Sequence, residues 1–488
     1  MLRARRRLIP PVGFPESIAC RPSFRTWRPW RHGGYVSHVP TAVLLALLLL
    51  AVPPAGAAEL AGCDNPPVIL IVVDTLRADR LGVYGYRRNT APALSSLARS
   101  AAVFERAYAT SPWTLPTMGS LYTGLLPAQH GAGAVLTVGE KVLYGQLRPE
   151  PPTIGEALLA FGYPTHAVAG NPNLHARFGV ARGFASYDYE AGGMDHLRRA
   201  DVIVDRALAW IAERHGAPFF LLVHIFDPHM NYDPPAATRG RFTAALPAGR
   251  CSLPFAETLR LRAGLQLTDD EQRFVGAAYD EEIAFVDEQM ARFAAGLRAL
   301  GVWQRAVVVF TADHGEELWD HGGFEHGHTM YDELLRVPLL VWGPGVRPGR
   351  IRTPVSLADV APTLLDALGA PPLPGTAGIS LWPLLRARRP PAARPLVAES
   401  PRYGPRAAAI IRWPHKLIAD VDANNVRLFD LAADPGERRE LKTSHAATAA
   451  ALRAELDRHI ASSTRTRPQA ASLDDDTRER LRALGYLE

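Results

Sequence analysis

The segment VILIVVD (residues 68–74) is an unbroken run of aliphatic residues that ends in an aspartate. Such a run predicts a strand buried on both faces of a parallel sheet, because a strand with one solvated face would alternate apolar and polar residues. Four similar runs follow along the chain. They are PTHAVAGN (164–171), PFFLLVHIFDPH (218–229), RAVVVFTADHG (305–315) and VPLLVWGPG (337–345).

Amphipathic segments separate these runs, the clearest being residues 200–214 and 269–300. Strands that alternate with helices predict an α/β fold, with a large, mostly parallel sheet sandwiched by helices. After residue 386 the pattern changes to short strands and turns. We expect a catalytic domain over 66–386, a small C-terminal α+β subdomain with an antiparallel sheet and a helix over 387–465, and a linker and terminal helix over 466–488.

Four of the runs end in polar residues that are able to bind a metal ion or an anion. Because the carboxyl ends of parallel strands meet at one edge of a sheet, we expect these side chains to converge although they span about 240 positions. A polar residue at one strand end is usually a helix cap, but polar residues at four strand ends favour a metal- or anion-binding site. They are Asp74, Asn171, His224 with Asp227 and His229, and Asp313 with His314.

Asp74, Asp313 and His314 have the character of metal ligands. Two carboxylates and an imidazole suit one divalent ion, and Ca, Mg, Mn and Zn all remain possible. The following segment adds His321, His326 and His328. A second metal ion, held by His326 or His328 with His224 and Asp227, is an open alternative.

The chain resembles the sulfatase family of the alkaline phosphatase superfamily from about residue 66 to its end. The resemblance rests on motifs in the family's order and approximate spacing. They are VILIVVDTLRADRLGVYGY (68–86), TLPTMGSLYTG (114–124), HIFDPHMNYDPP (224–235), TADHGEELWDHGG (311–323), YDELLRVPLLV (331–341), LFDLAADPGERREL (428–441) and DDDTRERLRALGYLE (474–488). It implies an alkaline-phosphatase-like fold, an ester hydrolase or transferase, and metal ligands at Asp74, Thr114, Asp313 and His314.

Thr114 stands where the family has the cysteine or serine that becomes formylglycine. Threonine cannot be converted in that way, and the family's two sulfate-holding lysines are also missing. Asn171 stands at the first lysine position, and His326 and His328 lie near the second. A hydroxyl nucleophile next to a metal ion is typical of the superfamily's phosphate-transferring branch.

We therefore expect Thr114 to attack a phosphate ester and to form a phosphothreonine. Asn171, His224 and His229 are the expected substrate-binding residues, and His326 or His328 the proton donor. Two alternatives stay open: a sulfuric ester hydrolase that works without formylglycine, and a non-catalytic ligand-binding protein. A small-molecule, glycan or lipid ester is the expected substrate, and neither the natural substrate nor an oligomeric state is predicted.

Residues 1–58 read as an export signal, with arginines ahead of the apolar run TAVLLALLLLAV (41–52). The lipobox-like LAGC (60–63) leaves lipidation of Cys63, with anchoring to a membrane, as an alternative. A disulfide between Cys63 and Cys251 is a further alternative. We expect a periplasmic or extracellular protein. Residues 1–57 hold eight arginines and one glutamate, so their removal changes the net charge from +5 to −2, and we expect no nucleic-acid partner.

Four further residues receive structural interpretations. Arg77 and Asp79 are expected to pair with each other, His130 to make hydrogen bonds in a loop, and Arg336 to be a buried structural arginine.

Overall fold

The computed structural model describes residues 65–138, 141–190, 198–214, 216–247, 267–423, 425–463 and 469–483. The expected export signal, the lipobox-like motif, Cys63 and Cys251 lie outside these ranges. Residues 59–488 form one compact unit. No helix among the described residues is both long enough and apolar enough to cross a membrane.

The main sheet confirms the strands predicted from the apolar runs. All of its pairings are parallel except those of β11, which runs antiparallel to both β8 and β2. The chain returns from β8 to β11 without a long crossover helix, and a parallel neighbour would need such a crossover. In sheet order the strands are β12 (Gly349–Ile351), β2 (Ala102–Tyr108), β11 (Arg336–Trp342), β8 (Val307–Ala312), β1 (Val68–Val73), β7 (Phe220–Ile225), β5 (Thr165–Ala169) and β6 (Ser186–Tyr189), and β13 (Val355–Ser356) also pairs with β2.

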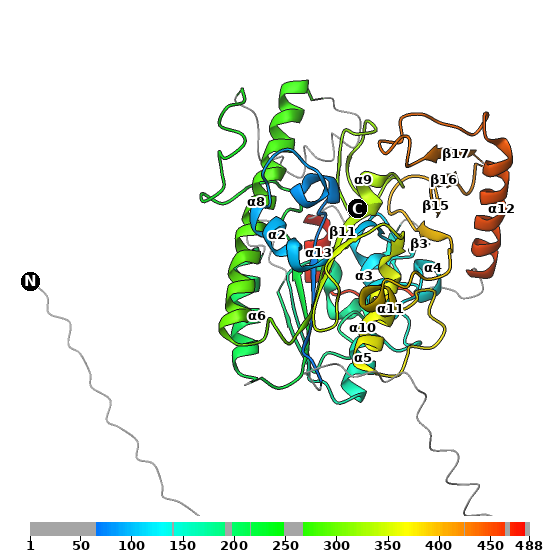
Figure 1. Cartoon of the computed structure of the whole chain (residues 1–488). Coiled ribbons are helices and arrows are strands. Elements are labelled where there is room, and N and C mark those ends of the chain that lie inside the picture. Colours follow the sequence, from blue (N-terminus) through cyan, green and yellow to red (C-terminus); the bar gives the residue numbers. More distant parts are fainter. Residues whose placement is uncertain are drawn as a thin grey trace, which may run out of the picture. The chain divides into compact units, whose positions relative to one another are not determined.

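Helices cover both faces of this sheet (Figure 1). One layer contains α2 (Pro92–Leu97), α6 (Ala200–Ala212) and the long α8 (Asp269–Ala299), which begins at a capping box between Thr268 and Glu271. The other layer contains α3 (Thr114–Thr123), α4 (Pro127–His130), α5 (Ile154–Ala160), α10 (Val360–Leu368) and α11 (Trp382–Ala387). Every residue of β1 and β7 is buried, as expected for strands covered on both sides.

The C-terminal region has the predicted small antiparallel sheet. Its strands are β14 (Leu396–Glu399), β15 (Ala407–Arg412), β16 (His415–Asp420) and β17 (Asn425–Asp430), and α12 (Ala446–Ser463) packs on them. The last helix, α13 (Asp475–Ala483), contacts the 3-10 helix η4 (Pro172–Leu174) directly after Asn171. Helix α13 therefore lies next to the segment that carries Asn171.

Short elements complete the fold. The segment between β8 and β11 contains the hairpin β9 (Glu317–Leu318) and β10 (Phe324–Glu325), followed by α9 (Asp332–Leu335). The remaining elements are the hairpin β3 (Val135–Val138) and β4 (Lys141–Tyr144), and the 3-10 helices η1 (Ala78–Arg80), η2 (Gly82–Tyr84), η3 (Ala98–Ser100), η5 (Ala176–Phe178) and η7 (Leu357–Asp359).

Candidate active site

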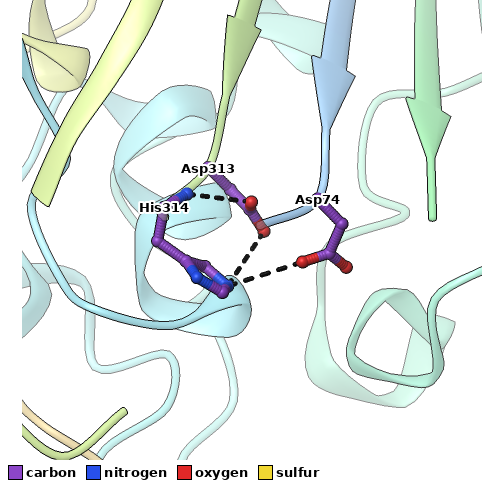
Figure 2. A group of neighbouring side chains, drawn as sticks. All are labelled: Asp74, Asp313 and His314. Atoms are coloured by element: carbon purple, nitrogen blue, oxygen red, sulfur yellow. Dashed lines mark hydrogen bonds and ion pairs between the residues drawn. The ribbon is translucent and has the colours of Figure 1, made fainter. Parts of the chain in front are cut away.

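Asp74, Asp313 and His314 lie together at one edge of the main sheet (Figure 2). The parallel register pairs Val73 with Ala312, so the residues that follow the two strands become neighbours. The Nε2 atom of His314 lies 3.5 Å from Oδ1 of Asp74 and 3.6 Å from Oδ2 of Asp313. All three side chains are fully buried.

The donor atoms of this group fit a divalent cation. Among the described residues, Asp74 Oδ1 and Asp313 Oδ2 are buried without a hydrogen-bond partner, whereas Asp313 Oδ1 accepts from the backbone N–H of His314 at 2.9 Å. His314 Nδ1 lies 2.8 Å from the carbonyl oxygen of Gly315, to which it donates, so the Nε2 lone pair faces the carboxylates. A cation there would satisfy the two unpartnered oxygens and the imidazole together.

The pKa values of the two carboxyl groups also favour a bound cation. Burial raises the pKa of Asp74 well above its ordinary value, and the neighbouring Asp313 raises it further. Burial acts on Asp313 in the same direction, but His314 and His224 hold the pKa of Asp313 below its ordinary value. Two buried carboxylates that face each other require a compensating positive charge.

Thr114 is the first residue of α3 and its hydroxyl faces this group. Its Oγ1 atom lies 3.3 Å from Nε2 of His314 and accepts from Nδ2 of Asn171 at 3.5 Å. The N-cap residue of α3 is Trp113, and its side chain makes no capping bond. The Trp113 indole instead donates to the carbonyl oxygen of Ser400 at 2.8 Å, which anchors the turn ahead of Thr114. The Thr114 hydroxyl is therefore not used as a helix cap.

Asn171 joins the nucleophile candidate to the metal group. Its Oδ1 atom accepts from the backbone N–H of Asn173 at 2.7 Å, which orients the amide. Its Nδ2 group then donates to Oδ2 of Asp74 and to Thr114. Asn171 thus contacts both a metal-ligand candidate and the candidate nucleophile.

Two further histidines that were predicted to bind substrate lie at the same sheet edge. His224, within β7, has both ring nitrogens buried without a hydrogen-bond partner, and its Nε2 lies 3.9 Å from Asp313 Oδ2. His229 bonds through Nδ1 to the carbonyl oxygen of Met230 at 2.7 Å and stacks on Phe226. Burial lowers the pKa of His229 to about 3, so this ring is a neutral group.

His326 joins the site through a buried carboxylate. Its Nδ1 atom lies 2.9 Å from Oε1 of Glu316, whose Oε2 accepts from the Tyr232 hydroxyl at 3.0 Å. Its ring centroid lies 4.5 Å from that of His314 and 5.0 Å from that of His229. Glu316 and Tyr232 were not among the site residues predicted from the sequence. The sequence feature that could have pointed to Glu316 is its place two residues after His314.

The second metal ion that we had considered is not supported. Asp227 accepts from the backbone N–H of Ala200 at 2.8 Å and pairs with Arg199 at 3.1 Å, so it fixes the start of α6. His328 Nε2 lies 2.8 Å from Oε2 of Glu317, a carboxylate outside the group of Asp74, Asp313 and His314. Among the described residues, Asp74, Asp313 and His314 form the one group of three suitable ligands.

Arg77, Asp79, His130 and Arg336 were expected to have structural roles, and the structure agrees with only part of these expectations. Arg77 pairs with Asp79 at 2.8 Å and also binds Asp320. His130 bonds to Ser120 at 3.1 Å, so it makes the expected hydrogen bonds, but it is the last residue of α4 and does not lie in a loop. The expectation for Arg336 is wrong, because its side chain is only half-buried and lines a cavity.

The Sulfatase family model matches residues 66–370 of the chain. The chain belongs to the sulfatase family. This sulfatase-family protein is 24% identical over 463 residues to the Delta 4,5-hexuronate-2-O-sulfatase of Bacteroides thetaiotaomicron, which covers 87% of the chain and 94% of the relative. It is 36% identical to arylsulfatase K of Danio rerio over 185 residues, which are 36% of the chain and 35% of that relative.

Solved structures confirm the alkaline-phosphatase-like α/β fold of this sulfatase-family chain. The structure of a 2-O GAG sulfatase superposes with a TM-score of 0.67 at 21% identity and covers 85% of the chain and 96% of that structure. The phosphonate monoester hydrolase of Agrobacterium radiobacter gives a TM-score of 0.66 at 21% identity and covers 82% and 96%. Both sulfatases and a phosphonate ester hydrolase thus share this architecture.

Proposed function

We propose that the protein is an exported, metal-dependent hydrolase or transferase that acts on phosphate or sulfate esters with Thr114 as its nucleophile. One observation carries the proposal: the Thr114 hydroxyl lies 3.3 Å from His314 Nε2, beside two carboxylate oxygens that have no partner. A purely structural threonine would not require buried, unpartnered carboxylates next to it.

Asp74, Asp313 and His314 would hold one divalent ion, with Thr114 Oγ1 as a further ligand. When bound, this ion supplies the positive charge that lowers the pKa of a neighbouring hydroxyl and offsets charge on the transferred group. Asn171 fixes the direction of the Thr114 hydroxyl through its hydrogen bond. The N-terminus of α3, at which Thr114 stands, also favours an anionic group.

In the first step, Oγ1 of Thr114 releases its proton to water and attacks the phosphorus atom, and the bond from phosphorus to the leaving alcohol breaks. His326 gives a proton to the departing oxygen, and Glu316 holds its ring through Nδ1. His224, His229 and Asn171 bind the non-bridging oxygens. The product is a phosphothreonine and a free alcohol.

In the second step, water or an acceptor alcohol attacks the phosphothreonine from the opposite side. The bond between phosphorus and Oγ1 breaks, the Thr114 hydroxyl regains its proton, and His326 takes up the proton of the attacking group. Hydrolysis and transfer differ only in this second nucleophile.

The choice of a phosphate ester follows from residues of this chain. Threonine cannot become formylglycine, so sulfate cannot leave by collapse of an aldehyde hydrate. Asn171, a neutral amide, stands at the first of the two positions where the family's lysines hold sulfate, and His326 and His328 lie near the second. Relatives named as sulfatases favour sulfate esters as the second candidate, and those named for hexuronate and GAG favour a glycan ester as the substrate class.

Turnover assays with matched variants test this proposal. The metal-loaded protein is assayed on nitrophenyl phosphate, a nitrophenyl phosphodiester and nitrophenyl sulfate. We expect Thr114→Val to lose activity on every ester, while Thr117→Val retains it, because the Thr117 hydroxyl of the same helix binds the carbonyl oxygen of Ser111. Sulfate turnover that survives in Thr114→Val would show that the nucleophile lies elsewhere.

A further inference from the structure

A polar cavity lies at the junction of the main sheet and the C-terminal sheet. It has a volume of about 320 Å³ and is lined by residues of β2, β11 and β12 and by Trp413 in the turn between β15 and β16. Arg336, the first residue of β11, lies opposite Tyr108 of β2 in the sheet register. In this register β2 is three strands away from β1, about 14 Å along the sheet. None of the residues that line the cavity belongs to the group around Thr114.

Positive charge dominates the lining. Arg106, Arg336 and Arg350 face the cavity together with only two carboxylates, Glu105 and Asp332. Glu105 pairs with one of these three arginines and with a further arginine, whereas Asp332 pairs with a lysine that does not line the cavity. Glu105 pairs with Arg350 at 3.2 Å and also with Arg352, and Asp332 pairs with the buried Lys416 at 2.7 Å.

Two of the arginines have no carboxylate of their own in the part of the chain that the structure describes. Arg336 donates from Nε to the carbonyl oxygen of Glu105 at 3.2 Å, and Arg106 donates from Nη1 to the carbonyl oxygen of Arg352 at 2.9 Å. Both contacts are to neutral backbone oxygens. Their guanidinium charges are therefore not neutralised by an ion pair, and further N–H donors remain on each fork.

Trp413 fixes one of these guanidinium groups. The Cζ atom of Arg106 lies 3.6 Å from the centroid of the Trp413 ring, which holds the planar fork by a cation–π contact. Burial lowers the pKa of Arg106, and repulsion from Arg352 and Arg336 adds to this effect. A group of arginines in a hollow of this size is an arrangement that recognises sulfate, phosphate or carboxylate.

We propose that this cavity binds an anionic group at a site separate from Thr114, through Arg106 and Arg336. The anion is either a second charged group of the ester substrate or a free inorganic anion. The binding needs no turnover, so the proposal stands independently of the proposed reaction.

Calorimetric titration of metal-loaded Thr114→Ala protein tests the site without interference from catalysis. The probes are inorganic sulfate and a doubly sulfated disaccharide. The double variant Arg106→Gln/Arg336→Gln is made in the same background. We expect its affinity for sulfate at this cavity to fall about tenfold or more. Arg406→Gln, an exposed arginine paired with Asp422, is the matched control and is expected to leave binding unchanged.

The two probes separate the sources of the anion. If the disaccharide binds about tenfold tighter than sulfate, and the double variant loses this difference in affinity, the site binds a second charged group of the substrate. Equal affinities assign it to a free anion. Sulfate binding that does not depend on the two arginines would overturn the proposal.

A second measurement uses the unaltered protein, so it does not depend on the folding of the variant. Crystals soaked in selenate are expected to show an anomalous peak within hydrogen-bond distance of Arg106 and Arg336. A map with no anion at these two arginines would overturn the proposal.

Discussion

The hydroxyl oxygen of Thr114 lies 3.3 Å from Nε2 of His314, a residue 200 positions further along the chain. This contact joins the start of α3 to the carboxyl end of β8 and places a nucleophile candidate at the edge of a metal-ligand group. The predictions below test the parts of this arrangement separately.

Asp313→Asn is expected to abolish stoichiometric metal binding, because it replaces the unpartnered anionic Oδ2 by a group that cannot bind a cation as strongly. Without metal, the same variant is expected to melt at a lower temperature than the natural protein, since His314 and His224 hold the pKa of Asp313 below its ordinary value and the ionised carboxylate therefore stabilises the metal-free fold. Metal content by mass spectrometry and melting with and without chelator measure both effects.

Asp320→Asn is the control for this prediction, because the Asp320 carboxylate pairs with Arg77 outside the metal group. It should keep full metal content. Metal at about 100 times its Kd should stabilise the natural protein by about 2.7 kcal/mol. Equal metal content in Asp313→Asn and the natural protein would contradict the assignment.

Asn171→Ala is expected to lower kcat more than it raises KM, because the hydroxyl of Thr114 loses the donor that orients it. A loss of about ten- to a hundredfold corresponds to one or two hydrogen bonds near charged groups. Asn173→Ala is the control, because the Asn173 side chain is buried and has no hydrogen-bond partner in the part of the chain that the structure describes. Similar kinetics for both variants would show that Asn171 has no special role.

Glu316→Gln should reveal whether His326 acts as the proton donor. The variant weakens the contact that holds Nδ1 of His326, so it should slow esters with poor leaving groups by about a hundredfold and nitrophenyl esters much less. Tyr232→Phe removes only the hydroxyl that binds Glu316 and should show a smaller effect in the same direction. An equal loss on both classes of leaving group would exclude this role.

His130 predicts a measurable pH dependence of stability. Burial lowers its pKa to about 3, and its Nδ1 accepts from the backbone N–H of Ala132 at 3.1 Å. Since free histidine titrates near 6.5, the unfolded chain binds one more proton between about pH 3 and 6.5. Stability from this residue is thus complete above about pH 6.5 and is lost as the pH falls towards 3.

His130→Gln should therefore reduce the slope of unfolding free energy against pH by up to about 1.4 kcal/mol per pH unit in this window. Urea unfolding at a series of pH values measures the slope, with the exposed His445→Gln as control. An unchanged slope in His130→Gln would mean that this histidine is protonated in the folded protein.

The sequence predicted the main sheet because continuous apolar runs such as residues 68–73 have one stable environment, a strand covered on both sides. It also predicted the convergence of Asp74, Asp313 and His314, since all three follow neighbouring strands. The direction of β11 was not predicted. An apolar run has the same pattern in either direction, and only the short return from β8 selects the antiparallel one.

Side-chain partners were harder to predict than positions. Asp227 follows β7 just as Asp313 follows β8, yet its carboxylate fixes the start of α6 and pairs with Arg199. Glu316 was missed because its partners, His326 and Tyr232, come from two other loops. Such roles depend on the tertiary direction of a side chain, for which a single sequence carries no local pattern.

Acid quenching during turnover, followed by mass spectrometry of the peptide that contains Thr114, is the most direct test of the proposed chemistry. With a phosphate ester and bound metal, we predict a phosphoryl group on Thr114 in the natural protein and none in Thr114→Val. Steady turnover with Thr114 unmodified, or turnover that persists in Thr114→Val, would contradict the account.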